Sequence, residues 1–153
     1  MSQTHRYLCF NLGKEEFALP LLSVKEVIGM PDITSIPQVP PHFLGIMNLR
    51  GLIISVMDLR VKLGLKPQAG EETAVIILDL GDYNLGIMVD QVNAVVELSD
   101  ADIADKPMMD SSKANDSVTG VFRKDDRLVL LLNVSKALSV EDRTALSKSA
   151  RAA

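Results

Sequence analysis

The sequence lacks tryptophan and contains a single cysteine, Cys9. One cysteine excludes an intrachain disulfide and is typical of a protein from a reducing compartment. Cys9 lies in the alternating apolar segment 7–12, so we interpret it as a buried structural thiol rather than a nucleophile. Aromatic residues make up only 4% of the chain. We therefore expect aliphatic side chains and methionine to fill the interior.

Long hydrophobic runs are also missing. No apolar stretch approaches the roughly 20 residues that a membrane-spanning helix needs, and the polar residues 1–6 lack the hydrophobic region of a signal peptide. The 153 residues are 47% hydrophobic and 24% charged, which is enough to form one globular domain or two small lobes that share a core. We expect a cytoplasmic protein without direct membrane insertion.

An excess of positive charge is absent, because the formal net charge is −4. A general nucleic-acid binder needs a dominant basic surface to neutralise phosphates. A small β-barrel that binds nucleic acid or a small ligand would further need aromatic platforms for stacking. The sequence therefore argues against nucleic acid as a partner.

Clusters of catalytic or metal-binding residues are absent as well. The two histidines, His5 and His42, lie far from each other in the sequence, and His42 falls among prolines. The acidic residues of segment 100–105 lack the glycine and the twelfth-position glutamate of a calcium loop. No glycine-rich phosphate loop or nucleophile elbow occurs. The sequence leaves open a Ser-His-Asp set that meets in space, but we expect no enzyme, no cofactor and no metal ion.

Short apolar runs separated by turn-forming residues dominate what is present, which is the pattern of an all-β fold. The proline-rich segment 31–41 is expected to be an extended connector, since proline cannot donate to a strand ladder. Asp58 is a candidate N-cap for a short helix through Leu63 that ends at Gly64. A terminal helix is expected from Asn133, fraying after about residue 145. We expect strands over 7–12, 17–19, 24–28, 43–49, 52–57, 73–80, 85–96, 118–122 and 128–132.

Two pairs of segments resemble one another at constant offsets. Residues 10–28 match 78–96 at an offset of 68, and residues 45–63 match 120–138 at an offset of 75. Two unrelated hairpins could also look this similar. The common-structure interpretation predicts two related β lobes, one over about 14–70 and the other over about 72–132, with the terminal segments closing the lobes.

Charge is distributed unevenly along the chain. Residues 45–68 carry four basic residues and one acidic residue, a net charge of +3, whereas residues 79–110 carry eight acidic residues and one lysine, a net charge of −7. Such a layout can steer a protein partner, although solvated faces that maintain solubility are an equal alternative.

Arg50 is a sharper candidate for partner contact. Arg50 and Gly51 lie between two apolar runs, consistent with a tight hairpin in which glycine takes a positive φ. A rigid hairpin can present the planar guanidinium to a carboxylate at little entropic cost. Arg50 could equally pair within the protein, with Asp58 or a carbonyl group.

The signature Asn48-Leu49-Arg50-Gly51, preceded by prolines 37 and 40 and followed by Asp-Leu-Arg at 58–60, resembles the CheW-like domain family. Residues 85–92 resemble the second signature of that family, and 120–121 with 128–133 resemble its closing hairpin. The resemblance covers residues 6–139.

The resemblance implies an all-β fold with short helices, in which two five-stranded SH3-like barrels pack side by side over a shared apolar seam. It implies a scaffolding role in chemotaxis: the family docks on a regulatory domain of the histidine kinase CheA and on the cytoplasmic tips of methyl-accepting chemoreceptors, and is recruited to membrane-associated receptor arrays. The implied partner-binding residues are Val24, Glu26, Asn48, Leu49, Arg50, Gly51 and Gly86.

Alternatives remain at several of these positions. Glu26 is also explained as a solvated charge, and Gly86 as a strand-packing position. Many relatives have proline where Ser55 stands, so the face near Ser55 is expected to differ in detail. A fused regulator with a receiver domain is a second possibility within the family. The segment after Leu138 is too short for a receiver domain, so we expect a free-standing adaptor.

Overall fold

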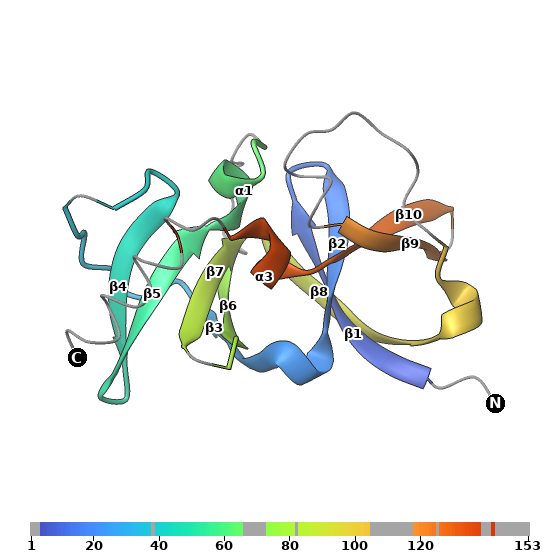
Figure 1. Ribbon diagram of the computed structural model, residues 1–153, viewed down its shortest axis with the longest axis horizontal. Helices are drawn as coiled ribbons and strands as arrows, with labels where there is room; N and C mark the ends of the chain where they lie inside the picture. The colour runs from blue at the N-terminus through green and yellow to red at the C-terminus, as the bar shows by residue number, and fades with distance from the viewer. Residues whose placement is uncertain are drawn as a thin grey trace.

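The computed structural model describes residues 4–37, 39–65, 73–81, 83–104, 118–124, 126–138 and 142. Strands dominate, with a few single-turn helices between them (Figure 1). In chain order the elements are β1 (Thr4–Leu12), β2 (Glu15–Pro20), η1 (Leu21–Ser23), β3 (Val24–Gly29), β4 (Phe43–Leu49), β5 (Leu52–Asp58), α1 (Leu59–Lys62), β6 (Ala74–Asp79), β7 (Asn84–Val89), β8 (Gln91–Ser99), η2 (Asp100–Asp102), β9 (Val118–Lys124), β10 (Arg127–Leu132) and α3 (Val134–Ala137).

The strands form two five-stranded sheets that lie side by side (Figure 1). Sheet A has the order β8-β1-β2-β10-β9, and sheet B has the order β3-β6-β7-β5-β4. We call the two halves of the molecule lobe A and lobe B after their sheets. The hairpin β1–β2 lies in lobe A, and η1 then carries the chain across to β3 in lobe B. The hairpin β6–β7 lies in lobe B, and the chain returns to lobe A at β8, so each sheet takes strands from both halves of the sequence.

The internal repeat expected from the sequence is present down to the strand register. In the parallel pairs, Ser55 lies opposite Leu85 in lobe B and Phe17 lies opposite Leu130 in lobe A. These two pairs are related by the offsets of 75 and 68 residues found in the sequence. Within the described ranges each lobe also has one isolated bridge, Thr34 with Ile46 and Ala104 with Val121. The repeat therefore reflects a common backbone plan.

The core has three parts that follow from strand alternation. One large cluster draws buried residues from both sheets and forms the shared apolar seam, with Phe10 and Leu12 on β1 and Ile76 and Leu85 from sheet B. A second cluster, which contains Ile54, belongs to sheet B alone. A third contains Cys9, Ala18, Phe122, Val129 and Leu131 and belongs to sheet A alone. Cys9 is fully buried, as the sequence predicts, and this burial raises the pKa of its thiol.

Each lobe contains a helical turn with an Asx cap, at the two positions expected from the sequence. The side chain of Asp58 accepts a hydrogen bond of 3.0 Å from the backbone N–H of Arg60 at the start of α1. The side chain of Asn133 accepts one of 3.3 Å from the N–H of Lys136 in α3. Gly64 follows α1 with a φ of 74°, which is the left-handed conformation that ends helices. The expected continuation of the terminal helix to about residue 145 lies, apart from Asp142, outside the described residues.

The proline-rich segment forms a single bridge to β4 rather than a strand. The N–H of Thr34 donates to the carbonyl of Ile46 at 2.8 Å, and the N–H of Ile46 donates back at 2.9 Å. The connector thereby covers the outer edge of β4. Gly45 makes this approach possible, because a Cβ at Gly45 would lie 2.0 Å from the carbonyl oxygen of Thr34.

The fold class expected from the sequence is confirmed, with two adjustments. The run 85–96, expected as one apolar segment, is two strands in different sheets that separate at Asp90. In the described part of the chain, the outermost strands of each sheet are not paired with one another, so each lobe is an SH3-like sheet without full closure. No described helix has the length and apolar character to cross a bilayer.

A candidate partner-binding surface at the Arg50 hairpin

Arg50 occupies the tip of the β4–β5 hairpin. Leu49 pairs with Leu52, so Arg50 and Gly51 form a two-residue turn. Their φ angles of 51° and 88° are those of a type I′ turn, whose twist matches the flanking strands. The side chain of Asn48 supports the turn by accepting a hydrogen bond of 2.8 Å from the N–H of Gly51. Asn48, Leu49, Arg50 and Gly51, all predicted as site residues, thus form one turn.

Arginine is an unusual residue for this position. Among the described residues, Arg50 is the only non-glycine with a positive φ. A side chain in the left-handed conformation costs about 1–2 kcal/mol, and type I′ turns usually carry asparagine or glycine there. The same turn would form at a lower conformational cost with asparagine or glycine, so the backbone geometry does not explain why arginine occupies this position.

The side chain of Arg50 pairs with Glu26 on β3. Arg50 Nη2 donates to Glu26 Oε1, and the hydrogen bond raises the pKa of the guanidinium further above its ordinary value. The Arg50 side chain remains 73% exposed and that of Glu26 is 32% exposed. An internal partner therefore exists, but it is Glu26 and not Asp58, which pairs with Arg60.

The ion pair joins the two edges of sheet B. β3 and β4 are its outermost strands, so contact between Glu26 on β3 and the β4–β5 turn requires the sheet to curl. An exposed ion pair contributes little to stability because water screens it, which makes it a weak closure. A carboxylate from a binding partner can therefore compete with Glu26 for the guanidinium at little cost to the fold.

The remaining predicted residues divide into two groups. Val24 begins β3, pairs with Leu78 and packs against the shared core while partly exposed, so it lies on the same strand as Glu26. Gly86 is buried in β7, between β5 and β6. A Cβ at Gly86 would lie 2.9 Å from Val75 Cγ1, which makes it a close-packing position apart from the exposed turn.

Arg60 forms a buried network that was not predicted from the sequence. Arg60 Nε donates to Asp58 Oδ1 at 2.9 Å, and Arg60 Nη1 donates to Asp90 Oδ1 at 2.6 Å. The other oxygen of Asp90 accepts from the N–H of Gly13 at 2.5 Å. The hydrogen bond with Asp58 is the main cause of the raised pKa of Arg60. The network connects α1 beside lobe B to the β1–β2 turn of lobe A.

This network corrects the charge layout expected from the sequence. Asp58 and Arg60 are buried, at 4% and 6% exposure, and Asp90 pairs internally, so they do not contribute freely to a steering surface. Positions 66, 82, 105, 106 and 110, which also entered those charge counts, lie outside the described residues. The spacing along the chain carries no signal for the contact between Arg60 and Asp90, because only the fold brings them together.

His42 and Lys62 also face a buried carboxylate. Asp142 is 0% exposed, and its oxygens lie 2.5 Å from His42 Nε2 and 2.7 Å from Lys62 Nζ. His42 precedes β4 in a turn, as expected. The contacts fix Asp142 against the start of β4 and against α1. Across the described ranges, no group of three or more His, Cys, Asp or Glu residues is arranged to hold a metal ion.

Ser55, where the family signature usually has proline, lies inside sheet B. It is 6% exposed and lies opposite Ile46 on one side and Leu85 on the other. The residue thus belongs to a strand with neighbours on both sides, where a backbone donor is compatible with regular pairing.

Residues 6–142 match the model of the CheW-like domain. The chain is 35% identical over 137 residues to the chemotaxis protein CheW of Klebsiella aerogenes, covering 89% of this chain and 82% of that protein. It is 30% identical over 135 residues to the chemotaxis protein CheW of Helicobacter pylori, covering 87% and 81%.

A solved structure has the same fold. The scaffolding protein TtCheW from Thermoanaerobacter tengcongensis superposes with a TM-score of 0.83 at 27% identity, over 92% of this chain and 96% of that one. Together with the two matched lobes and the Asn-Leu-Arg-Gly turn, the family match extends over nearly the whole chain. The protein belongs to the CheW-like domain family.

Proposed function

We propose that the protein is a non-catalytic scaffold of chemotaxis signalling, which couples the cytoplasmic tips of chemoreceptors to the regulatory domain of the kinase CheA. The names of its relatives, chemotaxis protein CheW, and the scaffolding role named for the structural neighbour support this proposal. In this role it acts in the cytoplasm at receptor arrays, and receptor state biases kinase state through contacts that both partners share with it.

The observation that carries the proposal is the conformation of Arg50. Its backbone is held in the left-handed region, and its side chain is 73% exposed. The type I′ turn needs this backbone conformation but does not need arginine, since asparagine or glycine adopts it at less cost. An arginine at such a position is a reason to look for function there. The guanidinium offers several donors in one plane, suited to a carboxylate of a partner.

The proposed contact uses Arg50 and Glu26 together. A partner carboxylate takes the guanidinium of Arg50, and the freed carboxylate of Glu26 accepts a donor from the same partner. Asn48 and Gly51 maintain the turn, while Leu49 and Val24 anchor the two strand ends against the core. Gly86 contributes through close packing of β7 against β6.

Co-sedimentation tests the coupling role directly. The full chain, mixed with fragments of its cognate kinase and receptor at low salt, is expected to bring both into one complex. Omission of the chain should separate the receptor from the kinase. Binding of only one partner, or of neither, would contradict the proposal.

An Arg50→Ala variant tests the site. It is expected to weaken partner binding by about tenfold or more, as removal of an interface hot spot does. Lys25→Ala, which removes an exposed charge on the same strand as Glu26, is the matched control and should change affinity little. Equal losses of affinity in the two variants would mean that general surface charge, and not the Arg50 turn, determines partner binding.

A further inference from the structure

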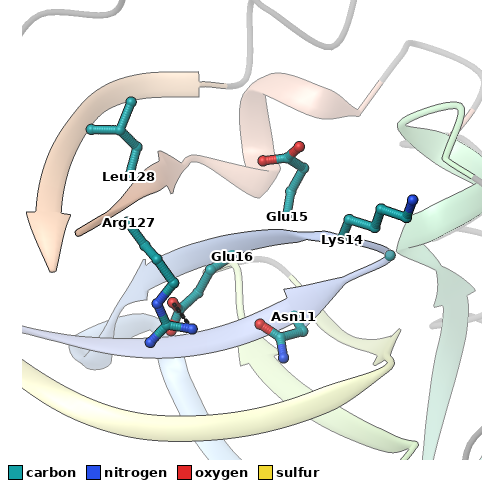
Figure 2. A pocket seen from close by; sticks show the side chains of 7 residues that line it. Asn11, Lys14, Glu15, Glu16, Arg127 and Leu128 are labelled. Atoms are coloured by element: carbon teal, nitrogen blue, oxygen red, sulfur yellow. Dashed lines mark ion pairs between the residues drawn. The ribbon is translucent and has the colours of Figure 1, made fainter. Parts of the chain in front are cut away.

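A pocket of about 390 Å³ lies in lobe A, away from the Arg50 hairpin of lobe B. It is formed by the β1–β2 turn and the start of β10, and the side chains that line it come from Asn11, Lys14, Glu15, Glu16, Arg127 and Leu128 (Figure 2). Figure 2 shows the guanidinium of Arg127 beside the carboxylate of Glu16, with a dashed line marking their ion pair. The pocket thus combines two carboxylates, two cationic side chains and one apolar wall.

Glu16 is the unusual member of the pocket. Its side chain is only 5% exposed. Glu16 Oε2 is well satisfied, since it accepts from Asn93 Nδ2 at 3.0 Å and from Lys124 Nζ at 3.5 Å. Glu16 Oε1 is buried and has no hydrogen-bond donor. Nearly all buried carboxylate oxygens are hydrogen-bonded, because an unmade bond to a charged group is costly.

Arg127 lies beside the unsatisfied oxygen without bonding to it. Arg127 Nη1 is 3.7 Å from Glu16 Oε1, beyond hydrogen-bond distance, and the Arg127 side chain is 62% exposed. An ion pair of this length and exposure is weak, at the lower end of the range for surface pairs. Arg127 therefore neutralises Glu16 loosely and can be displaced by a better-placed cation.

We propose that this pocket binds an arginine side chain of a partner protein, which displaces Arg127 and donates to Glu16 Oε1. A guanidinium supplies the missing N–H donor and replaces the positive charge that leaves with Arg127. It also makes shorter, charge-assisted hydrogen bonds to a carboxylate. Leu128, which is 61% exposed at the rim, offers a surface for the aliphatic part of the incoming side chain.

The corresponding region of lobe B lacks this chemistry. By the repeat offsets, Glu16 corresponds to Asn84, and Arg127 corresponds to Leu52. The pocket is therefore a property of lobe A and not of the shared backbone plan. The proposal does not depend on the coupling role, and its test needs neither kinase nor receptor.

The probe is N-acetyl-arginine N′-methylamide, which presents the side chain as a peptide does, with no free terminal charges. Backbone amide shifts of the full chain are followed by NMR during titration. Saturable shifts confined to residues 11–16 and 127–128 are expected. The matched citrulline derivative has nearly the same shape but no charge, and should bind about tenfold more weakly. Shifts that do not saturate, or equal binding of citrulline, would overturn the proposal.

Three variants test which groups of the pocket hold the guanidinium. Glu16→Gln should weaken binding of the probe by about tenfold or more. Glu97→Gln, which removes an exposed carboxylate on β8 outside the pocket, is the matched control and should change binding by less than about twofold. Arg127→Ala should strengthen binding by about two- to fivefold, because it removes the internal competitor. Weaker binding after Arg127→Ala would mean that Arg127 is itself a ligand group, and would overturn the proposal even if Glu16→Gln failed to fold.

Discussion

Lobe A and lobe B repeat one strand order, yet the polar residues they carry at equivalent positions differ. The helix caps are retained, as Asp58 in one lobe and Asn133 in the other. Glu26, by contrast, corresponds to Ala94 in lobe A, and Glu16 corresponds to Asn84 in lobe B. Residues that the backbone needs are kept in both lobes, whereas residues of the proposed partner surface and of the pocket occur in one.

The glycines at the isolated bridges illustrate what the backbone needs. Gly45 and Gly120 are equivalent, and each faces a carbonyl oxygen of the connecting segment that covers its strand. An added Cβ would lie 2.0 Å from Thr34 O in lobe B but 3.1 Å from Ala104 O in lobe A. The φ of Gly45 is 143°, while that of Gly120 is not in the positive region. In both lobes the connecting segment approaches a glycine of the strand, and the approach is closer in lobe B.

The largest expected effect separates these two glycines. Gly45→Ala should lower the free energy of unfolding by roughly 3–5 kcal/mol, because the methyl group overlaps the backbone and the φ is unfavourable. Gly120→Ala should cost about 1–2 kcal/mol, since only the contacts with Ile103 and Ala104 must shift. Urea denaturation measures both values. Equal losses would break the comparison between the two bridges.

Asp90 provides the next test, because its equivalent in the repeat is Leu22. Asp90→Ala removes one partner of buried Arg60 and the acceptor for the Gly13 N–H, so we expect a loss of about 2–4 kcal/mol. Leu22 is 99% exposed in η1, and Leu22→Ala should change stability by less than about 0.5 kcal/mol. A small effect at Asp90 would show that the network does not hold the lobes together.

The Arg50–Glu26 pair is expected to contribute less to stability than to binding. Arg50→Ala removes only an exposed, solvent-screened ion pair and leaves the turn in place, so the free energy of unfolding should change little. Arg50→Gly relieves the backbone strain and should leave stability unchanged or slightly raised. A sharp fall in the melting temperature of both variants would identify Arg50 as a structural residue of lobe B.

A last effect appears only as the pH rises, and it concerns Cys9, whose equivalent in lobe B is Ile77. Burial raises the pKa of the Cys9 thiol in the folded state, while the unfolded thiol titrates near its ordinary value. The folded state therefore binds the thiol proton more tightly than the unfolded state does. The contribution of the thiol to the free energy of unfolding is present below about pH 9 and declines as the pH rises above that value. Between pH 8 and pH 10, the free energy of unfolding of the wild-type protein should fall by about 1 kcal/mol more than that of Cys9→Ala. Parallel curves would show that the thiol is not linked to folding.

Features that depend on neighbouring residues were predictable from the sequence. The alternation of apolar residues located most strands, and the Arg50-Gly51 pair indicated a two-residue turn with a positive φ. Asp58 and Gly64 marked the limits of α1, and the prolines of segment 31–41 indicated a connector. Each of these depends on a side chain acting on its own backbone or on residues within one turn.

The repeat extended this local information to the architecture. The offsets of 68 and 75 residues predicted two related lobes, and the strand registers agree with the offsets. The lobes do not follow the expected bounds of 14–70 and 72–132, because β2 lies in sheet A and β6 and β7 lie in sheet B. Similarity of segments does not say which hairpin pairs with which third strand. The crossing of β3 and β8 between the lobes therefore could not be derived from the repeat.

The candidate sites also combine features set by residues near one another in the chain with features set by the tertiary structure. By itself the sequence determined the strands, the caps, the turn at Arg50 and the duplication, because these follow from interactions between residues near one another in the chain. Only the tertiary structure decided that Glu26 meets Arg50, that Arg60 is buried between two aspartates, and that Glu16 lies beneath Arg127 with an unsatisfied oxygen. Apart from the local contact of Arg60 with Asp58, these contacts join residues that are far apart in the chain, and they exist because burial of the apolar core brings their elements together.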